Sequence, residues 1–246
     1  MTAQPPTPGD RTEDDPGDRP GDGAARVVGV GPWPGGPDAW PRLPSGGLDP
    51  RYDPELLADG DTRNVVDAYR YWTVEAIVAD LDRRRAEHPA TQLHVAVENW
   101  AHDLNIGSVV RTANAFNAAS VRIVGRRRWN RRGAMVTDRY LHVEHDPDAA
   151  ALAAWAATAG PPGDDGAPTR LPVVGVDNVP GSVALEGLAL PASCVLLLGQ
   201  ESAGLSASAQ AVCDVVVHVT QHGSTRSLNA GAAAAVAMWA WAVQHL

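Results

Sequence analysis

The pattern of apolar and polar positions changes near residue 90. From residue 91 onward, short runs of Val, Leu and Ile alternate with stretches in which apolar residues recur every three or four positions. Runs of the first kind predict strands and stretches of the second kind predict helices. The predicted strands are residues 93–97, 121–124, 171–176, 194–198 and 215–219. The predicted helices are residues 106–116, 148–157, 206–213 and 227–245.

Short apolar strands that alternate with helices predict an α/β fold, with a mainly parallel sheet and helices on both faces. Ligands usually bind to such sheets beyond the carboxyl ends of the strands. The segments that follow the predicted strands are therefore where we expect chemistry. The last predicted helix, residues 227–245, is apolar nearly all round, so we expect it to be buried in the core or in a subunit interface.

The first ninety residues have a different character. Residues 1–50 are rich in Pro, Gly and Asp, which predicts a disordered or loosely draped tail. Residues 63–88 carry apolar positions at helical spacing and are followed by Pro89, which predicts a helix. We therefore expect residues 51–90 to form a helical extension before a main domain of residues 91–246.

The formal net charge of −9 by itself argues against a nucleic-acid partner. The charge is uneven, however, because residues 122–139 contain seven Arg and one Asp. Arginine binds phosphate in a bidentate way, and Trp129 within this segment could stack on an unpaired base. A solvated loop is the open alternative. The arginines that we expect to contact RNA are Arg126, Arg127, Arg128, Arg131 and Arg132.

Nothing in the sequence indicates a membrane or a metal. No basic-then-apolar leader begins the chain, and the longest apolar stretch, residues 232–243, is too short to span a bilayer. We therefore expect a cytoplasmic protein. Cys194 and Cys213 lie in apolar surroundings without metal-ligand spacing, so we expect core thiols and no metal site.

The first stretch that can carry chemistry leads into the helix predicted at residues 106–116. Asn105 is expected to cap that helix, and Gly107 allows another backbone to approach closely. Arg111 follows nearly two helical turns later, and its guanidinium suits a phosphate. Taken alone, this stretch is better explained by an ordinary helix cap with a surface arginine.

The second stretch follows the predicted strand 194–198. It contains Gly199 and Gly204, and a loop with two glycines can expose backbone N–H and C=O groups to an adenine or an amino-acid moiety. Glu201 lies at the carboxyl end of the strand, where a buried carboxylate would need a partner. An ordinary turn followed by a helix capped by Ser206 explains the stretch equally well.

The third stretch is a loop of small polar residues between the strand 215–219 and the last helix. Ser227 and Asn229 lie at the start of that helix, where free backbone N–H groups need acceptors. Simple capping explains one of these side chains and leaves the rest of the polar loop unexplained.

Together the three stretches resemble the three sequence motifs of the SpoU (TrmH-like) branch of the SPOUT superfamily, whose members are RNA ribose 2′-O-methyltransferases. The motifs, in the family's order, are N-x-G-x-x-x-R from Asn105 to Arg111, L-L-L-G-x-E-x-x-G-L from Leu196 to Leu205, and S-L-N-x-G-x-A from Ser227 to Ala233. The resemblance covers residues 91–246. Each motif is modest alone, but three in order and in strand–loop–helix contexts are specific.

The resemblance implies a deep trefoil knot in the C-terminal part of the domain, which is rare among folds. It also implies a homodimer in which the partner subunit supplies Arg111, and S-adenosyl-L-methionine bound in a bent form within the knotted loops. The residues that would hold this cofactor are Leu198, Gly199, Glu201, Gly204, Val217, Val219, Ser227 and Leu228.

The implied reaction passes a methyl group from a sulfonium, in line, to a ribose 2′-hydroxyl. The family assigns activation of the hydroxyl to the arginine that matches Arg111. Because arginine stays protonated, we expect it to hold the phosphate and to stabilise the developing alkoxide. The residues expected to orient ribose, arginine and donor by hydrogen bonds are Asn105, Glu201, Ser227 and Asn229.

We expect a structured RNA as the substrate, with transfer RNA favoured and ribosomal RNA next. One alternative is an RNA-binding dimer that keeps the knot without catalysis, although the intact set of motif residues argues against it. Another is methylation of a base, although the S-L-N motif points to ribose.

Overall fold

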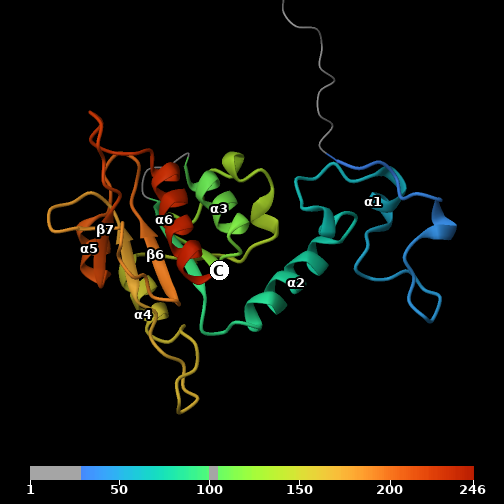
Figure 1. Ribbon diagram of the computed structural model, residues 1–246, viewed down its shortest axis with the longest axis horizontal. Coiled ribbons are helices and arrows are strands. Elements are labelled where there is room, and N and C mark those ends of the chain that lie inside the picture. Colours follow the sequence, from blue (N-terminus) through green and yellow to red (C-terminus); the bar gives the residue numbers. More distant parts are fainter. Residues whose placement is uncertain (1–28, 100–104) are drawn as a thin grey trace, which may run out of the picture. The chain divides into compact units, whose positions relative to one another are not determined.

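The computed structural model describes residues 29–99 and 105–246 (Figure 1). Residues 1–28 of the expected tail lie outside the described residues. The described residues divide into two compact units, one of residues 29–40 and 54–71 and the other of residues 41–53, 72–99 and 105–246. The domain limits expected from composition stay a prediction.

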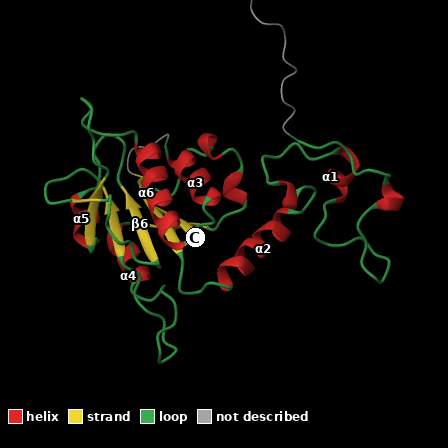
Figure 2. Cartoon of the chain, in the orientation of Figure 1, coloured by secondary structure: helices red, strands yellow, loops and turns green. Residues whose placement is uncertain are grey.

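The larger unit is built on a seven-stranded sheet in the order β3-β2-β1-β6-β4-β7-β5 (Figure 2). Every pairing between these strands is parallel. The strands are β1 (Leu93–Asn99), β2 (Ser120–Gly125), β3 (Val143–Asp146), β4 (Val173–Val176), β5 (Val183–Ala184), β6 (Cys194–Leu198) and β7 (Val215–His218). The predicted parallel sheet is thereby confirmed, and all the carboxyl ends of its strands lie at one edge.

Helices cover both faces of the sheet, as predicted. On one face, α3 (Ile106–Ala115) and α6 (Ala230–His245) pack side by side on the strands. On the other face lie α4 (Ala149–Ala156) and α5 (Ala207–Val212). Successive strand residues point to opposite faces, so Val95 belongs to the first core and Ala96 to the second.

Two predicted helices begin later than the spacing of their apolar residues indicated. Helix α2 (Val74–Ala86) does not begin at residue 63, because Thr73 has extended backbone angles and caps the helix by accepting from the N–H of Ala76 at 3.1 Å. In the same way, α6 begins at Ala230 and not at Ser227, since Asn229 caps it. Strands β3 and β5 were not predicted.

The smaller unit consists of turns and short helices, namely η1 (Pro37–Ala39), α1 (Pro54–Asp59) and η2 (Asp67–Tyr69). Its centre is the buried carboxylate of Asp61, which pairs with Arg63 at 2.7 Å and accepts from the backbone N–H of Tyr71 at 3.0 Å. These bonds hold the pKa of Asp61 down at about 2, against the opposing effect of burial.

Two short helical turns, η3 (Arg132–Ala134) and η4 (Thr137–Arg139), follow β2 and pack against α3. None of the helices within the described ranges is long and apolar enough to cross a membrane.

A buried polar cluster lies between the sheet and α4. The ring of His94 is 7% exposed, contacts Ser120 Oγ through Nδ1 at 2.8 Å and meets the ring of Trp155 edge-on. Arg122 pairs with Asp146 at 2.6 Å and lies 3.9 Å from the centroid of the same Trp155 ring. Burial, helped by the positive charge of Arg122, lowers the pKa of His94 from 6.5 to about 4.

The buried histidine predicts how stability depends on pH. Unfolding returns the pKa of His94 from about 4 to 6.5, so the unfolded chain binds more protons between these values. We expect this one group to reduce the free energy of unfolding by about 3 kcal/mol as the pH falls from about 6.5 towards 4. Urea unfolding at several pH values measures the effect, and His94→Gln should remove it. The exposed His222→Gln is the control, and equal pH dependence in both variants would contradict the assignment.

Candidate functional site

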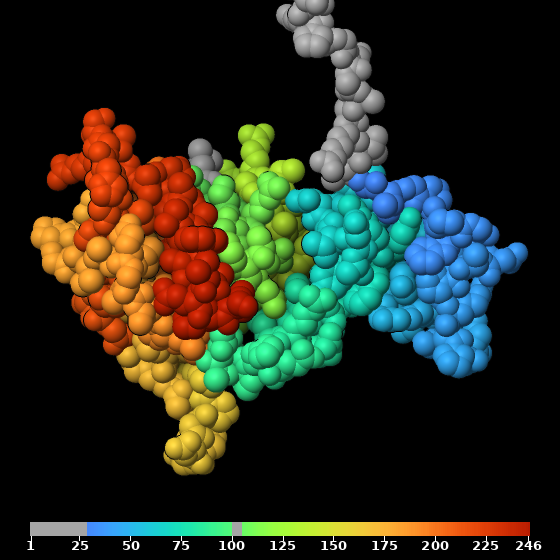
Figure 3. Space-filling view, in the orientation of Figure 1, coloured from blue at the N-terminus to red at the C-terminus, as the bar shows by residue number. Residues whose placement is uncertain are grey.

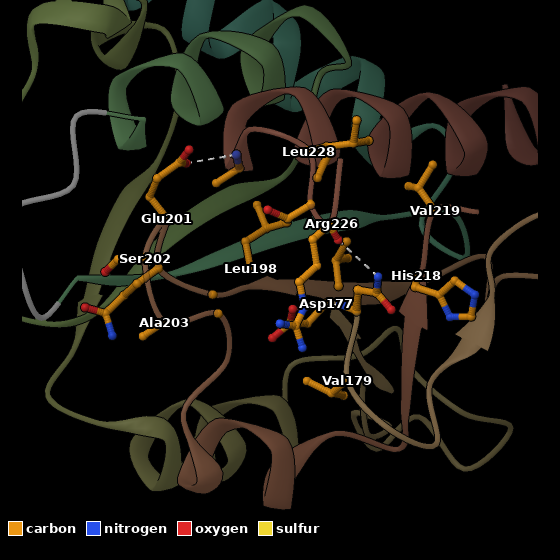
Figure 4. Close-up of a pocket in the computed structure, with 18 of the residues that line it drawn as sticks. Asp177, Val179, Leu198, Glu201, Ser202, Ala203, His218, Val219, Arg226 and Leu228 are labelled. Carbon is orange, nitrogen blue, oxygen red and sulfur yellow. Dashed lines mark hydrogen bonds between the residues drawn. The ribbon is translucent and has the colours of Figure 1, made fainter. Parts of the chain in front are cut away.

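A pocket of about 460 Å³ opens at the carboxyl ends of three adjacent strands, β4, β6 and β7 (Figure 4). Its walls are the segments that follow these strands and the first turn of α6. Because the strands are parallel neighbours, segments far apart in sequence converge here. The side chains labelled around it include Asp177, Val179, Leu198, Glu201, His218, Val219, Arg226 and Leu228.

The wall that follows β6 is a tight loop that only glycine can form. The N–H and C=O groups of Gln200 and Gly204 bond to each other at 3.0 and 2.9 Å. Gly204 has a φ of +66°, and a Cβ on Gly199 would lie 2.1 Å from the carbonyl carbon of Gly204. The close approach folds the loop back on itself, with Gly199 and Gly204 both in the pocket lining.

Asp177 fixes this loop from the neighbouring strand β4. One carboxylate oxygen accepts from the N–H of Leu205 at 2.7 Å, and the other accepts from the N–H of Asn178 at 2.7 Å. The same carboxylate lies against Gly204, where a Cβ would be 2.3 Å away from it. Sequence reasoning missed Asp177, although its position directly after a predicted strand was the available signal.

Glu201 joins the three sequence motifs. Its carboxylate accepts from the side-chain amide of Asn105 at 2.7 Å, from that of Asn229 at 3.2 Å and from the backbone N–H of Ala230 at 2.9 Å. Asn229 also donates to the side-chain oxygen of Asn105 at 3.1 Å. Figure 4 shows the Glu201 bond at the start of α6 beside the pocket. Three residues predicted to act together thus form one hydrogen-bonded group.

The role expected for Asn105 needs correction. It occupies the position before α3, but its side chain makes no capping hydrogen bond to that helix. The amide bonds to Glu201 and Asn229 instead. Glu201 is itself exposed and not buried, so its partners fix its direction more than they compensate for lost hydration.

The structure brings most of the predicted cofactor residues together in the pocket. Those that line it are Leu198, Gly199, Glu201, Gly204, Val219, Ser227 and Leu228. Val217 does not line it, because its side chain is fully buried in the core. The carbonyl of Val217 nevertheless accepts from the N–H of Asp177 at 2.9 Å and so supports the wall.

Arg111 lies outside this pocket. Its side chain is exposed on α3 and makes no ion pair with any residue between 29 and 99 or between 105 and 246. Ser227 is exposed at the pocket wall, two positions before Asn229 in the sequence.

The pocket also contains residues that the sequence reasoning did not single out. Besides Asp177, they include Asn178, Val179, His218, Gln221 and Arg226. Asn178 donates to the carbonyl of Arg226 at 3.4 Å, which ties the β4 wall to the segment before α6. Nδ1 of His218 contacts Ser182 Oγ at 2.9 Å. Asn178 and Val179 closely follow β4 and His218 ends β7, which was the available signal for them. Gln221 and Arg226 lie in the segment between β7 and α6.

The arginines of the segment after β2 are exposed to solvent, as contact with RNA would require. The side chains of Arg126, Arg127, Arg128, Arg131 and Arg132 are exposed. The side-chain amide of Asn99 donates to the carbonyls of Arg126 and Arg128 at 2.6 and 3.0 Å and holds the segment in place. Trp129, for which a stacking role was expected, is 9% exposed and packs in the core, and the stacking role stays a prediction.

The two cysteines behave as core thiols. Burial raises the pKa of Cys194 to about 12 and that of Cys213 to about 11. Both thiols are therefore protonated at neutral pH, and neither can serve as a nucleophile there.

The sequence is similar to those of known proteins. Residues 92–239 match the SpoU rRNA Methylase family. An uncharacterized tRNA/rRNA methyltransferase of Mycobacterium ulcerans is 34% identical over 146 residues, which are 59% of this chain and 45% of that protein. A relative of the same description from Mycolicibacterium vanbaalenii is 30% identical over 193 residues, 77% of this chain and 58% of that protein. The chain thus spans about half the length of these relatives.

Solved structures show the same fold. The SpoU methyltransferase AviRb of Streptomyces viridochromogenes, in complex with AdoMet, is 25% identical with a TM-score of 0.55, over 63% of this chain and 58% of that one. The TrmH/SpoU tRNA modifying enzyme of A. aeolicus is 19% identical with a TM-score of 0.53, over 68% of this chain and 83% of that one.

The close contact at Gly199 predicts an asymmetry between two glycines. Gly199→Ala places a methyl group against the backbone of Gly204, so we expect a loss of about 2 kcal/mol in unfolding free energy and a distorted pocket wall. Gly223→Ala is the matched control, because no heavy atom of the described chain lies within 4 Å of a Cβ at that position. Chemical denaturation measures both. Equal stability of the two variants would show that the loop is not tightly packed.

Proposed function

This chain belongs to the SpoU rRNA Methylase family, and on that premise we propose that it transfers a methyl group from S-adenosylmethionine to a ribose 2′-hydroxyl of a structured RNA. The observation that carries the proposal is the hydrogen-bonded group of Asn105, Glu201 and Asn229, one residue from each motif, beside the pocket. Transfer RNA is the favoured substrate and ribosomal RNA the next, in keeping with relatives that are named tRNA/rRNA methyltransferases.

The pocket suits the cofactor. Its volume of about 460 Å³ is in the range of small-molecule sites, about 300–1,000 Å³. Gly199 and Gly204 bring the loop backbone into the pocket lining, and Leu198, Val219 and Leu228 offer apolar contact. AviRb, at 25% identity, was solved with AdoMet, which supports the assignment. When bound, S-adenosylmethionine supplies an electrophilic methyl group on a sulfonium.

The residues of the chain supply position and charge. The Glu201 group holds the start of α6 and the start of α3 at fixed separation, so Ser227 and Asn229 can orient the ribose. Arg111 stays protonated, holds a phosphate of the RNA and stabilises negative charge as it develops on the 2′-oxygen. The hydroxyl proton passes to that phosphate or to water. Most of the rate gain comes from alignment.

The proposal includes a homodimer in which Arg111 acts on the pocket of the partner. Two observations support it. Arg111 is exposed and does not line the pocket of its own subunit. Helix α6 exposes Trp239 (60%) and Val243 (64%) on the surface, in the red C-terminal region of Figure 3. Neighbouring exposed apolar residues on one helix are typical of an interface.

We also propose the trefoil knot of the family for residues 171–246. In support, the segment from β7 to α6 lies against the loop after β6, with the Ala230 N–H bonded to Glu201. Family membership and the likeness to solved SpoU structures point the same way.

The activity is tested by titrating S-adenosylmethionine and by transferring a labelled methyl group to bulk tRNA and bulk rRNA. We expect binding of the cofactor, transfer to one RNA class and recovery of a 2′-O-methylnucleoside after digestion. Arg111→Ala should bind the cofactor normally and lower transfer by at least about a hundredfold. Cofactor binding without any transfer would support the silent RNA-binding dimer instead, and a methylated base would overturn the ribose assignment.

Shared sites predict complementation between inactive subunits. Arg111→Ala lacks the arginine, whereas Gly199→Ala is expected to lack a usable pocket but keeps Arg111. Mixing the two after subunit exchange should restore roughly a quarter of wild-type activity, because half of the dimers then hold one intact site of two. Mixing Arg111→Ala with the double variant, Arg111→Ala and Gly199→Ala, is the control and should restore none. If the first mixture is also inactive, Arg111 does not act across the interface.

A further inference from the structure

A second pocket, of about 390 Å³, is lined by residues of the edge strand β3, its neighbour β2 and the segment between them, and shares no residue with the first. Its apolar lining residues are Ile123, Trp129, Leu141 and Val143. Its rim carries three arginines, Arg127, Arg131 and Arg139. The family motifs do not include any of these residues.

Only one of the three arginines of this pocket forms an ion pair within the described residues. Arg131 pairs with Asp138 at 3.3 Å. Arg127 and Arg139 are exposed and have no ion-pair partner in the part of the chain that the structure describes. Glu144 is the remaining carboxylate in the lining. Guanidinium groups gathered at one concave site favour an anion, and their fork geometry matches phosphate.

The fold holds this rim in place. The side chain of Asn99 bonds to the carbonyls on either side of Arg127, at Arg126 and Arg128. Between η3 and η4, Met135 and Val136 adopt positive φ angles of 49° and 69°, which are unfavourable for these residues. Thr137 supports that turn by donating to the carbonyl of Ala134 at 2.6 Å. A rim positioned in advance loses less entropy when it binds a ligand.

The pocket is also connected to the motif that carries Arg111. Gly107 on α3 packs so closely on η3 that a Cβ there would lie 2.7 Å from the N atom of Gly133. The segment after β2 leaves the sheet at the same edge as the segments that form the first pocket, because all strands are parallel. The arginines that follow β2 therefore lie at the edge of the sheet that also carries the first pocket.

We propose that this second pocket anchors one unpaired nucleotide of the substrate RNA, chiefly through its phosphate, away from the site of methyl transfer. A nucleotide is a reasonable occupant for a volume of about 390 Å³ that is lined by three arginines and a few apolar side chains. The inference rests on the proposed function in that the RNA is the substrate. It adds Arg139 to the RNA-binding residues and keeps Arg127. It departs from the sequence-based expectation for Arg126 and Arg132, which do not line the pocket and are assigned little of the RNA affinity.

The test compares two pairs of substitutions with equal loss of charge. Arg127→Ala with Arg139→Ala removes two arginines from the pocket rim. Arg126→Ala with Arg132→Ala removes two exposed arginines of the same segment that do not line it. Binding to bulk tRNA and bulk rRNA is measured by filter retention from low to high salt, together with cofactor affinity, thermal midpoint and steady-state methyl transfer.

We expect the rim pair to weaken RNA binding by at least about tenfold and to lower the salt slope by about 0.7 for each lost phosphate contact. The control pair should change affinity less than about threefold. The KM for RNA should rise in the rim pair while kcat at saturating RNA, cofactor affinity and thermal midpoint stay unchanged. Replacing Arg127→Ala by Arg127→Lys in the rim pair should recover part of the RNA affinity.

Equal losses in the two pairs would overturn the inference in favour of diffuse electrostatic attraction, as would a wild-type chain that binds neither RNA. A loss in the rim pair that comes with a lower thermal midpoint and is not recovered by Arg127→Lys would also overturn it. Because RNA binding is measured without turnover, failure of the proposed function is distinguishable. In that case the wild-type chain transfers no methyl group, whereas the difference between the two pairs persists.

Discussion

The arrangement of the site depends on one carboxylate, that of Glu201. It accepts hydrogen bonds from Asn105, from Asn229 and from the first backbone N–H of α6, and so joins three segments that are distant in sequence. A negative charge at the start of a 16-residue helix is also favoured by the helix dipole. Because Glu201 is exposed, water competes for these bonds and their contribution to stability is modest. Their main effect is geometric, since they set the distance between α3 and α6.

The all-parallel sheet makes this group possible. Only strands that run in the same direction bring the ends of β4, β6 and β7 to one edge, where Asp177 can fix the loop that bears Glu201. The same rule brings the arginine segment after β2 to that edge. The site therefore combines a rigid frame with loops whose conformations are fixed by a few side chains, namely Asn99, Asp177 and Glu201.

Local patterns in the sequence predicted the central strands, because each is a short apolar run. The convergence of the three motifs followed from the family resemblance. They did not predict β3, where Val143 is the only apolar residue and Asp146 is buried through its pair with Arg122. Asn105 was predicted to be a helix cap because it lies directly before α3. The acceptor of its side-chain amide, Glu201, is 96 residues away and could not be predicted from the local sequence. Trp129 was expected to be exposed because it lies among arginines in the sequence. Its burial in the core depends on tertiary packing. Each failure concerns a contact between distant residues, which periodicity and local composition do not encode.

The long sequence separations within the Glu201 group also have a consequence for biosynthesis. Its bonds span 96 and 28 residues, and one of its donors belongs to the first turn of α6. During synthesis the chain emerges from the ribosome from its N-terminus, at about 5–20 residues per second. Strand β1 and helix α3 can be made and still lack their partners until α6 has emerged. Nascent chains therefore cannot complete the Glu201 group early, and it forms only after the start of α6 has been synthesised.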